Sequence, residues 1–275
     1  MKTKFITLLC LFFLAFTPTS WGIAAEALRV GVVPQFDSRH LSAIWTPVLE
    51  RLGRDTGLAF QLDIPPSIPA FEKNLDAGQY DLAYMNPYHF AIAHKRQGYE
   101  ALVRDLAGDF SAIIVVARDS PITSVAMLAG KTVAFPSPNA LAALLPRADF
   151  ARTFHIAVTE KYTKTHSSAY LSVALGEADA GGGARSTFEV LDPQIKSRLR
   201  IVYESRHFPP HPLAAHPRVP PTLRQQITLA FLALATEPSG AELLAEIPMK
   251  HAGPAQSGDY AALTGLDLQA FRIDQ

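Results

Sequence analysis

The chain has 275 residues but only one cysteine, Cys10, which lies in an apolar run near the N-terminus. An internal disulfide needs two cysteines, so none is possible. If the N-terminal segment that contains Cys10 is removed, the remaining chain has no cysteine and therefore no thiolate chemistry. Such a protein has to be held together by its hydrophobic core. About 250 residues are enough for that, as one large domain or as two lobes.

Long apolar runs are missing after the first 25 residues. There, Lys2 and Lys4 precede the run "FITLLCLFFLAF", and the small residues "IAAEA" follow. This pattern is typical of a secretory signal peptide, and the run is short for a membrane span. We therefore predict a signal peptide over residues 1–25, with cleavage after Ala25 or Ala27, and export to the periplasm.

An excess of charge of one sign is also missing. Without Lys2 and Lys4, two of the 25 basic residues, 23 remain against 25 acidic residues, a formal charge of −2. Nucleic acid and anionic membrane surfaces are therefore not expected as partners. An anionic ligand would have to be held by local dipoles rather than by the overall field.

The sequence contains no G-x-S-x-G, H-E-x-x-H or P-loop motif, so we predict no enzymatic activity and no cofactor. His207, His211 and His216 are close enough in sequence to suggest zinc. Four prolines interrupt this stretch, however, and no carboxylate or cysteine completes a ligand set. We predict no metal site, and we expect the stretch to pack near a hinge.

Strands and helices alternate along the chain, which predicts a parallel α/β architecture. "ALRVGVVP" and "YDLAYM" are typical of buried strands, and residues 38–55 have apolar positions at helical spacing. The strand-helix set occurs twice, with crossings expected near residues 111–118 and 201–205. We predict two lobes, 26–112 with 205–275 and 113–204, each with a mostly parallel sheet flanked by helices.

Three predicted helix starts follow strands directly, at Asn86-Pro87, Ser137-Pro138 and His166-Ser167-Ser168. We expect the second helix to begin at Pro138, the third at Ser168, and the C-terminal tail to pack on the surface. Each helix start offers unpaired backbone N–H groups. Together, at the carboxyl edge of the sheets, they could hold a small oxyanion without any lysine or arginine.

Five residues near the first two helix starts are candidate ligand contacts. Asn86 is explained equally well as a helix cap, whereas Tyr88 and His89 are polar-tipped side chains in a first turn where aliphatic residues are more usual. Ser137 also fits a capping role. Asn139 is a poor residue for a helix interior and has no evident local task.

Three further candidates lie later in the chain. His166 and Ser167 either contact the ligand or belong to a polar loop that caps the next helix. Arg185 follows the three glycines of "AGGG", which permit close backbone approach. Arg185 could bind an anion in bidentate fashion or form an inter-lobe salt bridge. Gln35, after the first strand, is expected to cap.

Several motifs occur in an order that resembles the periplasmic substrate-binding proteins for phosphate, phosphite and phosphonate of ABC transporters. They are "GVVPQ", "FEKNLDAGQYDLAYMNPYHFAIA", "DSPITSVAMLAGKTVAFPSP", "PRADF", "HSSAYLSVALGEADAG" and "RIVYES". The resemblance covers nearly the whole mature chain. It implies a two-lobed type II binding-protein fold with a two-strand hinge, a monomer, and delivery of a small anionic or polar ligand to an ABC permease. It also places His166 in a cleft turn.

The chain departs from this family where the family holds its ligand. The usual hydroxyl-rich, glycine-containing turn reads "PSPNALAA", and the usual tyrosine after the third strand aligns with Phe90. The acidic residue that meets an aminoalkyl group in some members aligns near Arg185. Two alternatives therefore stay open: an accessory of a sensor kinase that recognises another solute, and an exported hydrolase using His166 or His89 as base.

Overall fold

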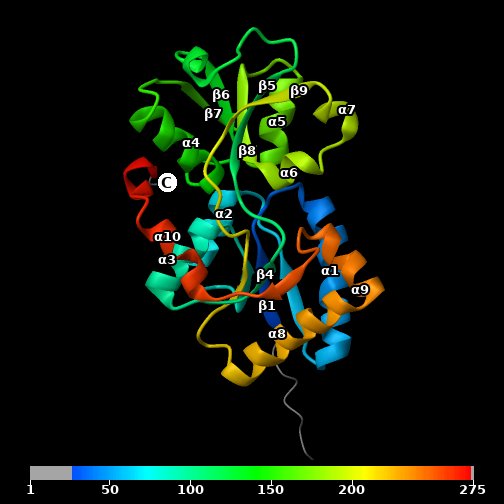
Figure 1. Cartoon of the computed structure of the whole chain (residues 1–275). Coiled ribbons are helices and arrows are strands. Elements are labelled where there is room, and N and C mark those ends of the chain that lie inside the picture. The colour runs from blue at the N-terminus through cyan, green and yellow to red at the C-terminus, as the bar shows by residue number, and fades with distance from the viewer. Residues whose placement is uncertain (1–26, 274–275) are drawn as a thin grey trace, which may run out of the picture.

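The computed structural model describes residues 27–273, which form two lobes, each built on one β-sheet (Figure 1). The predicted signal peptide, with Cys10, lies outside the described residues. The first sheet has the order β11-β4-β10-β3-β1-β2, and the second has the order β7-β6-β8-β5-β9. The strands are β1 (Leu28–Val32), β2 (Phe60–Asp63), β3 (Leu82–Tyr84), β4 (Glu100–Asp105), β5 (Ala112–Ala117), β6 (Thr132–Phe135), β7 (Thr159–Tyr162), β8 (Ala180–Ala184), β9 (Leu199–Glu204), β10 (Leu213–Ala215) and β11 (Ala252–Pro254).

Helices cover the faces of both sheets, as a two-lobed α/β fold requires (Figure 1). They are α1 (Ser38–Thr56), α2 (Ile68–Asp76), α3 (Pro87–Gln97), α4 (Leu141–Arg152), α5 (His166–Ala174), α6 (Arg185–Glu189), α7 (Pro193–Lys196), α8 (Pro221–Thr236), α9 (Pro238–Glu246), α10 (Ala261–Thr264) and the 3-10 helices η1 (Val125–Leu128), η2 (Ser257–Tyr260) and η3 (Leu268–Phe271).

The two ends of helix α1 are determined by local sequence. The Asp37 side chain accepts a hydrogen bond from the backbone N–H of His40 and caps the start of the helix. Gly57 ends it in the left-handed conformation, with φ of 71°. The apolar positions between these ends are buried against the first sheet, as their spacing predicted.

Both sheets are mixed rather than purely parallel, because the chain passes twice between the lobes. β10 begins where the chain returns to the first lobe, so it runs away from the lobe junction and antiparallel to β3. β5 begins where the chain enters the second lobe, and it runs antiparallel to β8 for the same reason. The strand pairs β1–β2, β1–β3, β6–β7 and β6–β8 are parallel, as predicted.

The crossings lie just outside the segments in which we expected them. Residues 112–117 and 199–204 are β5 and β9 of the second sheet, where β5 pairs with both β8 and β9. The chain passes between the lobes after β4 and after β9. There Phe110 and Phe208 form an isolated antiparallel bridge. The hinge therefore consists of two extended segments in contact, flanking rather than containing these strands.

Two helices start at other residues than predicted. Residues 138–140 form a turn, and α4 begins only at Leu141, so Ser137 does not cap it. The Ser137 hydroxyl instead accepts from the Asn139 N–H, 3.4 Å away, inside the turn. Helix α5 begins at His166 rather than Ser168, because the Thr165 side chain accepts the Ser168 N–H and serves as the cap.

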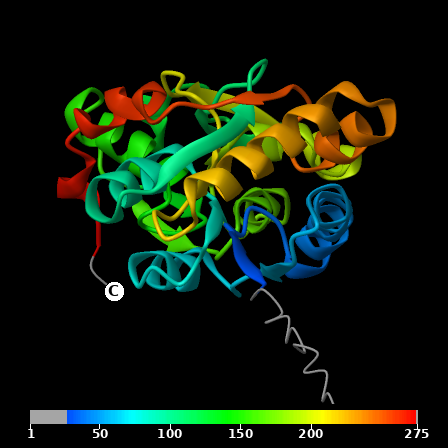
Figure 2. The same cartoon turned by 90° about the horizontal axis from the view of Figure 1, so that it is seen from below.

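The C-terminal segment is a third link between the lobes, and it does more than pack on the surface. Leu266 and Leu268 are buried. Figures 1 and 2 show this red segment beside the green helix α4 of the second lobe. Arg152 of α4 donates to the carbonyl oxygens of Leu266 and Asp267, each at 3.0 Å. The amide of Asn139 exchanges two hydrogen bonds with the backbone of Ile273, at 3.0 and 2.9 Å.

The lobes are in close contact in this structure. Leu141, Leu144 and Ala148 of α4 belong to the same apolar cluster as the core of the first lobe, while two smaller clusters fill the second lobe. Among the described helices, no single one is long and apolar enough to cross a membrane. The pair α8 and α9 reaches that length and composition only together, and it is bent by 107°.

Candidate functional site

The lobe junction collects the carboxyl ends of the parallel strands from both sheets. Leu213, at the start of β10, pairs with Tyr84 at the end of β3, and Ala112, at the start of β5, pairs with Ala184 at the end of β8. β10 and β5 each begin after a crossing between the lobes. The ends of β3 and β8, which pair with these starts, therefore face the other lobe. Seven polar side chains at this edge are at most 5% exposed: Gln35, Asn86, His89, Ser137, His166, Thr187 and His211.

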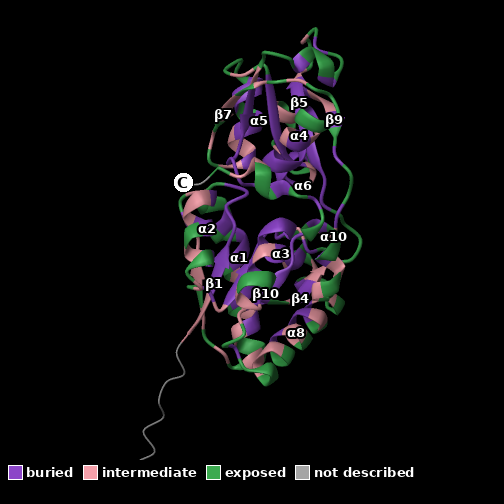
Figure 3. Ribbon diagram, turned by 90° about the vertical axis from the view of Figure 1, so that its left-hand side faces the viewer, coloured by how far each residue is buried: buried purple, intermediate pink, exposed green. Residues whose placement is uncertain are grey.

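These seven side chains are buried although they are polar. Figure 3 shows the buried residues concentrated in the strands and on the helix faces turned toward them. Buried polar groups are costly unless they are paired, so each needs a partner or a task. Two of their atoms, Nδ1 of His89 and Oγ1 of Thr187, are buried without any hydrogen-bond partner among the described residues.

His89 lies in the first turn of α3 and is held by a carboxylate. Its Nε2 is 2.8 Å from Oε1 of Glu72, which projects from α2. The Glu72 carboxylate can only accept, so Nε2 of His89 donates this hydrogen bond. The His89 backbone N–H donates to Oδ1 of Asn86 at 2.8 Å. The Asn86 side chain therefore acts as the α3 cap, one of its two predicted roles.

His166 faces the junction from the second lobe. Its Nδ1 accepts the backbone N–H of Ala184 at 3.0 Å, which leaves the ring proton on Nε2. Burial, and secondarily the proximity of His89, lowers the pKa of His166 to about 3. His166 is therefore neutral at physiological pH and can donate from Nε2.

His211 is a third imidazole of the same group. Its ring stacks on Tyr84 with centroids 5.4 Å apart, and Nε2 of Gln35 lies 2.8 Å from its Nε2. Burial lowers the pKa of His211 well below the usual value, and the proximity of His166 and His89 lowers it further. The imidazoles of His89, His166 and His211, from both lobes and from the second crossing, therefore lie close enough to affect one another's pKa.

The neutral histidines make the stability of the protein dependent on pH. At low pH the unfolded chain binds protons that buried His166 and His211 do not bind. Their contribution is therefore complete above the unfolded pKa, near 6.5, and is lost as the pH falls below it. We expect the free energy of unfolding to fall from pH 7 to pH 5, by up to about 1.4 kcal/mol per pH unit for each histidine.

Urea unfolding at pH 7, 6 and 5 measures this slope. His166→Gln should make it shallower, while His251→Gln, at an exposed position, should leave it unchanged. A wild-type slope that His166→Gln does not alter would contradict the assignment.

The other predicted residues lie apart from the histidines or are already engaged. Asn139 is buried, and its amide is taken up by Ile273. Tyr88 lines a separate pocket of about 270 Å³ between α3 and the C-terminal segment. Ser167 is half-buried beside His166, and Ser137 is buried in the turn after β6. The structure thus brings Asn86, His89, Ser137 and His166 to the junction edge and places Tyr88 at a separate pocket.

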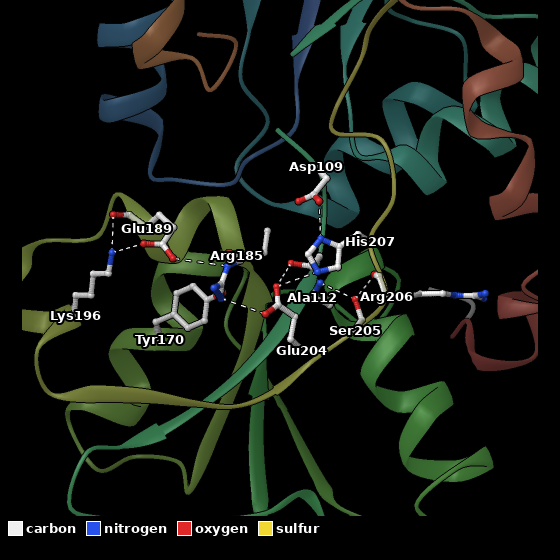
Figure 4. A network of polar contacts seen from close by, with 12 residues as sticks. Asp109, Ala112, Tyr170, Arg185, Glu189, Lys196, Glu204, Ser205, Arg206 and His207 are labelled. Carbon is white, nitrogen blue, oxygen red and sulfur yellow. Dashed lines mark hydrogen bonds and ion pairs between the residues drawn. The ribbon is translucent and has the colours of Figure 1, made fainter. Parts of the chain in front are cut away.

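Arg185 pairs within its own lobe. Its guanidinium lies 3.3 Å from Glu204 at the end of β9 and 3.8 Å from Glu189 in α6 (Figure 4). The same network continues to His207, whose Nδ1 is 2.5 Å from Asp109 on the other crossing. Of the two alternatives for Arg185, the inter-lobe salt bridge does not form in this structure, because its guanidinium pairs with Glu204 and Glu189 of the same lobe.

Glu72, Thr187 and His211 were not predicted as site residues. His211 carried a usable signal, since it lies two residues before the short apolar strand β10 that follows the second crossing. A returning strand places the residue before it at the carboxyl edge of its antiparallel neighbour. Among residues 27–273, no three His, Cys, Asp or Glu side chains are grouped so that they could hold a metal ion. His207, His211 and His216 contact Asp109, Tyr84 and Tyr99 respectively.

The sequence matches a known protein family over most of its length. The model of the family "ABC transporter, phosphonate, periplasmic substrate-binding protein" matches residues 30–260. A phosphate-import protein of Mycolicibacterium smegmatis is 24% identical over 173 residues, which are 60% of this chain. The match spans about half of that relative, 52% of its length.

Solved structures share the type II periplasmic binding-protein fold at low sequence identity. A binding protein of a phosphonate ABC transporter from Pseudomonas aeruginosa has a TM-score of 0.79 at 16% identity, covering 89% of this chain and 87% of its own. A protein from Prochlorococcus marinus, in complex with methylphosphonate, has the same TM-score and identity and covers 90% and 99%. The two-lobed fold is therefore shown.

Proposed function

The chain belongs to the family of periplasmic substrate-binding proteins of phosphonate ABC transporters, and on this premise we propose that it binds a small phosphorus oxyanion between its lobes. Phosphonate, phosphite and phosphate form the ligand class. The ligand-loaded protein would deliver its cargo to an ABC permease in the periplasmic space, without chemical turnover.

One observation carries this proposal. The imidazoles of His89, His166 and His211, from both lobes and from the second crossing, lie near one another and are buried. Two atoms at the junction, Nδ1 of His89 and Oγ1 of Thr187, lack partners among the described residues. Leaving such atoms unpaired costs about 1–3 kcal/mol each, and a ligand with several oxygens would relieve that cost.

The electrostatics suit a small oxyanion. Helices α3 and α5 both begin at this edge, one capped by Asn86 and the other by Thr165. Their partial positive charges favour an anion, and the neutral His166 can donate a hydrogen bond from Nε2. Lobe closure about the two crossings would bury the ligand and exclude water.

Calorimetry and thermal unfolding test the ligand class. We expect at least one of phosphate, phosphite, methylphosphonate and 2-aminoethylphosphonate to bind saturably. A ligand present at 100 times its Kd should add about 2.7 kcal/mol of stability. His166→Ala should abolish binding, and His251→Gln should not change it.

Two results would count against the function. One is binding of carboxylates with no binding of any phosphorus compound. The other is release of phosphate from phosphoesters by the purified protein, which would indicate a hydrolase.

A further inference from the structure

A cavity of about 650 Å³ lies where the two lobes and the C-terminal segment meet, and we call it the side cavity. Helix α2 and Arg96 of the first lobe form part of its wall. Asn139, in the turn after β6 of the second lobe, forms another part, and Arg272 and Ile273 of the C-terminal segment complete it. Because Arg96 is exposed at its edge, the side cavity opens to solvent between the lobes.

The Glu72 side chain connects the side cavity with the buried histidines. Glu72 lines the cavity and is itself buried, at 8% exposure. Oε1 of the same carboxylate lies 2.8 Å from Nε2 of His89. His89 belongs to the group of buried imidazoles at the junction, so a single side chain reaches both the solvent-open cavity and that group.

The lining of the side cavity is basic. Lys73, Arg96 and Arg272 contribute three cationic side chains, and none of them forms an ion pair among residues 27–273. Two carboxylates, Glu72 and Asp76, oppose them, but Glu72 is already bonded to His89. The cations are therefore available to an anion that arrives from solvent.

This positive charge is local to the side cavity. The chain as a whole is balanced, with 25 basic and 25 acidic residues. Tyr88 of α3 lies close enough to respond to the cavity: burial raises its pKa, while Arg272 and Arg96 lower it. The two guanidinium groups therefore act together on one region, although they come from different elements.

We propose that the side cavity is the entrance through which the oxyanion reaches the buried histidines, and that Lys73, Arg96 and Arg272 attract it there. This inference rests on the proposed function and deepens it by assigning the route of the ligand. Charges at an entrance raise the rate of encounter, whereas the contacts around the bound ligand determine how slowly it leaves. The three cations should therefore control association rather than dissociation.

Lys73→Gln combined with Arg96→Gln tests the attraction. Calorimetry with methylphosphonate gives Kd, ³¹P exchange spectroscopy gives koff, and the two together give kon. We expect the double variant to lower kon at least about threefold at low salt and to leave koff within about twofold of wild type. The decrease of kon with added salt should also become shallower, because fewer charges remain to be screened.

Arg54→Gln combined with Lys131→Gln is the matched control. These variants remove two exposed cations that face away from the junction, one in the last turn of α1 and one just before β6. Both rate constants should stay at their wild-type values. An equal loss of kon in the control would overturn the inference, since the overall field would then be responsible. A change in koff alone would overturn it too, because the cations would then contact the bound ligand.

Blocking the side cavity tests the route itself. In a Cys10→Ser background, Ala70→Cys supplies one thiol on the α2 wall, and a bulky maleimide attached there fills the entrance. Labelling should slow both association and dissociation of methylphosphonate at least about tenfold and leave Kd nearly unchanged, because a blocked route hinders passage in both directions. Lys131→Cys, labelled in the same way, should leave both rates at their wild-type values.

Unchanged exchange rates after labelling at position 70 would overturn the entrance alone, since the ligand would still bind. Failure of phosphate, phosphite, methylphosphonate and 2-aminoethylphosphonate to bind the unmodified protein would instead overturn the proposed function, and the entrance with it. The two failures are therefore distinguished by whether the wild-type protein binds any of these ligands.

Discussion

Removal of residues 266–275 is expected to lower the free energy of unfolding by about 3–6 kcal/mol. The segment buries Leu266 and Leu268 against the rest of the protein. It also receives hydrogen bonds on its backbone from three side chains of the second lobe: Asn139, Arg147 and Arg152. Buried leucines contribute about 1.5–3 kcal/mol each.

The truncated protein should also be looser at the lobe junction. Arg147 holds the segment from a fixed position, because its Nε binds Glu160 at 2.7 Å while its Nη1 reaches the carbonyl oxygens of Pro138 and Phe271. Without the segment, the two crossings and the packing of α4 are left to connect the lobes. We expect a larger radius of gyration in small-angle scattering and a lower urea midpoint.

A point variant isolates the hydrogen bonds from the apolar burial. Asn139→Ala removes both bonds to Ile273, whereas Asn139→Asp keeps the acceptor for the Ile273 N–H and loses the donor. We expect a loss of about 1–3 kcal/mol for alanine and a smaller loss for aspartate. Truncated protein with wild-type stability and wild-type dimensions would show that the segment does not hold the lobes together.

Gly182→Val should destabilise the second lobe by at least about 3 kcal/mol. A Cβ at Gly182 would collide with Cε1 of Phe135 and lie 3.1 Å from Cδ1 of Ile114, so the ring on the neighbouring strand would have to move. Phe135 is completely buried in the core of the second lobe. Valine adds two further methyl groups to the same collision.

Gly258→Ala is the matched control, since a Cβ there meets nothing within 4 Å. Its free energy of unfolding should stay within about 0.5 kcal/mol of wild type. Urea unfolding of both variants, followed by tryptophan fluorescence and far-ultraviolet circular dichroism, measures the difference. Equal stability of Gly182→Val and wild type would mean that Phe135 is not fixed as the structure shows.

The glycines of β8 show what a local pattern can and cannot predict. "AGGG" predicted close approach of the backbone, and the approach is real. The neighbours are the rings of Phe135 and Tyr170 rather than a ligand. Tyr170 also donates from its hydroxyl to the carbonyl oxygen of Ala184. A run of glycines indicates that another group approaches the strand closely, but it does not identify that group.

The turn at residues 137–140 shows the same limit. The Ser-Pro pair predicted a helix start at Pro138. The helix starts later because the Asn139 amide pairs with Ile273, 134 residues away, and this contact holds the turn open. The helix propensities of residues 137–140 cannot predict a hydrogen bond to Ile273. The family resemblance, in contrast, depended on short motifs and predicted the two-lobed fold correctly.

The sequence by itself determined the regular elements, the alternation of strands and helices, and the family. All of these depend on periodicity, capping and short motifs within a few residues. Tertiary structure alone decided which polar side chains share the junction: His211 reaches Gln35 across 176 residues, and Glu72 fixes His89 from another helix. The physical reason is that burial and hydrogen bonding act through space. The chemistry at the junction is therefore set by contacts between residues that are distant in the sequence.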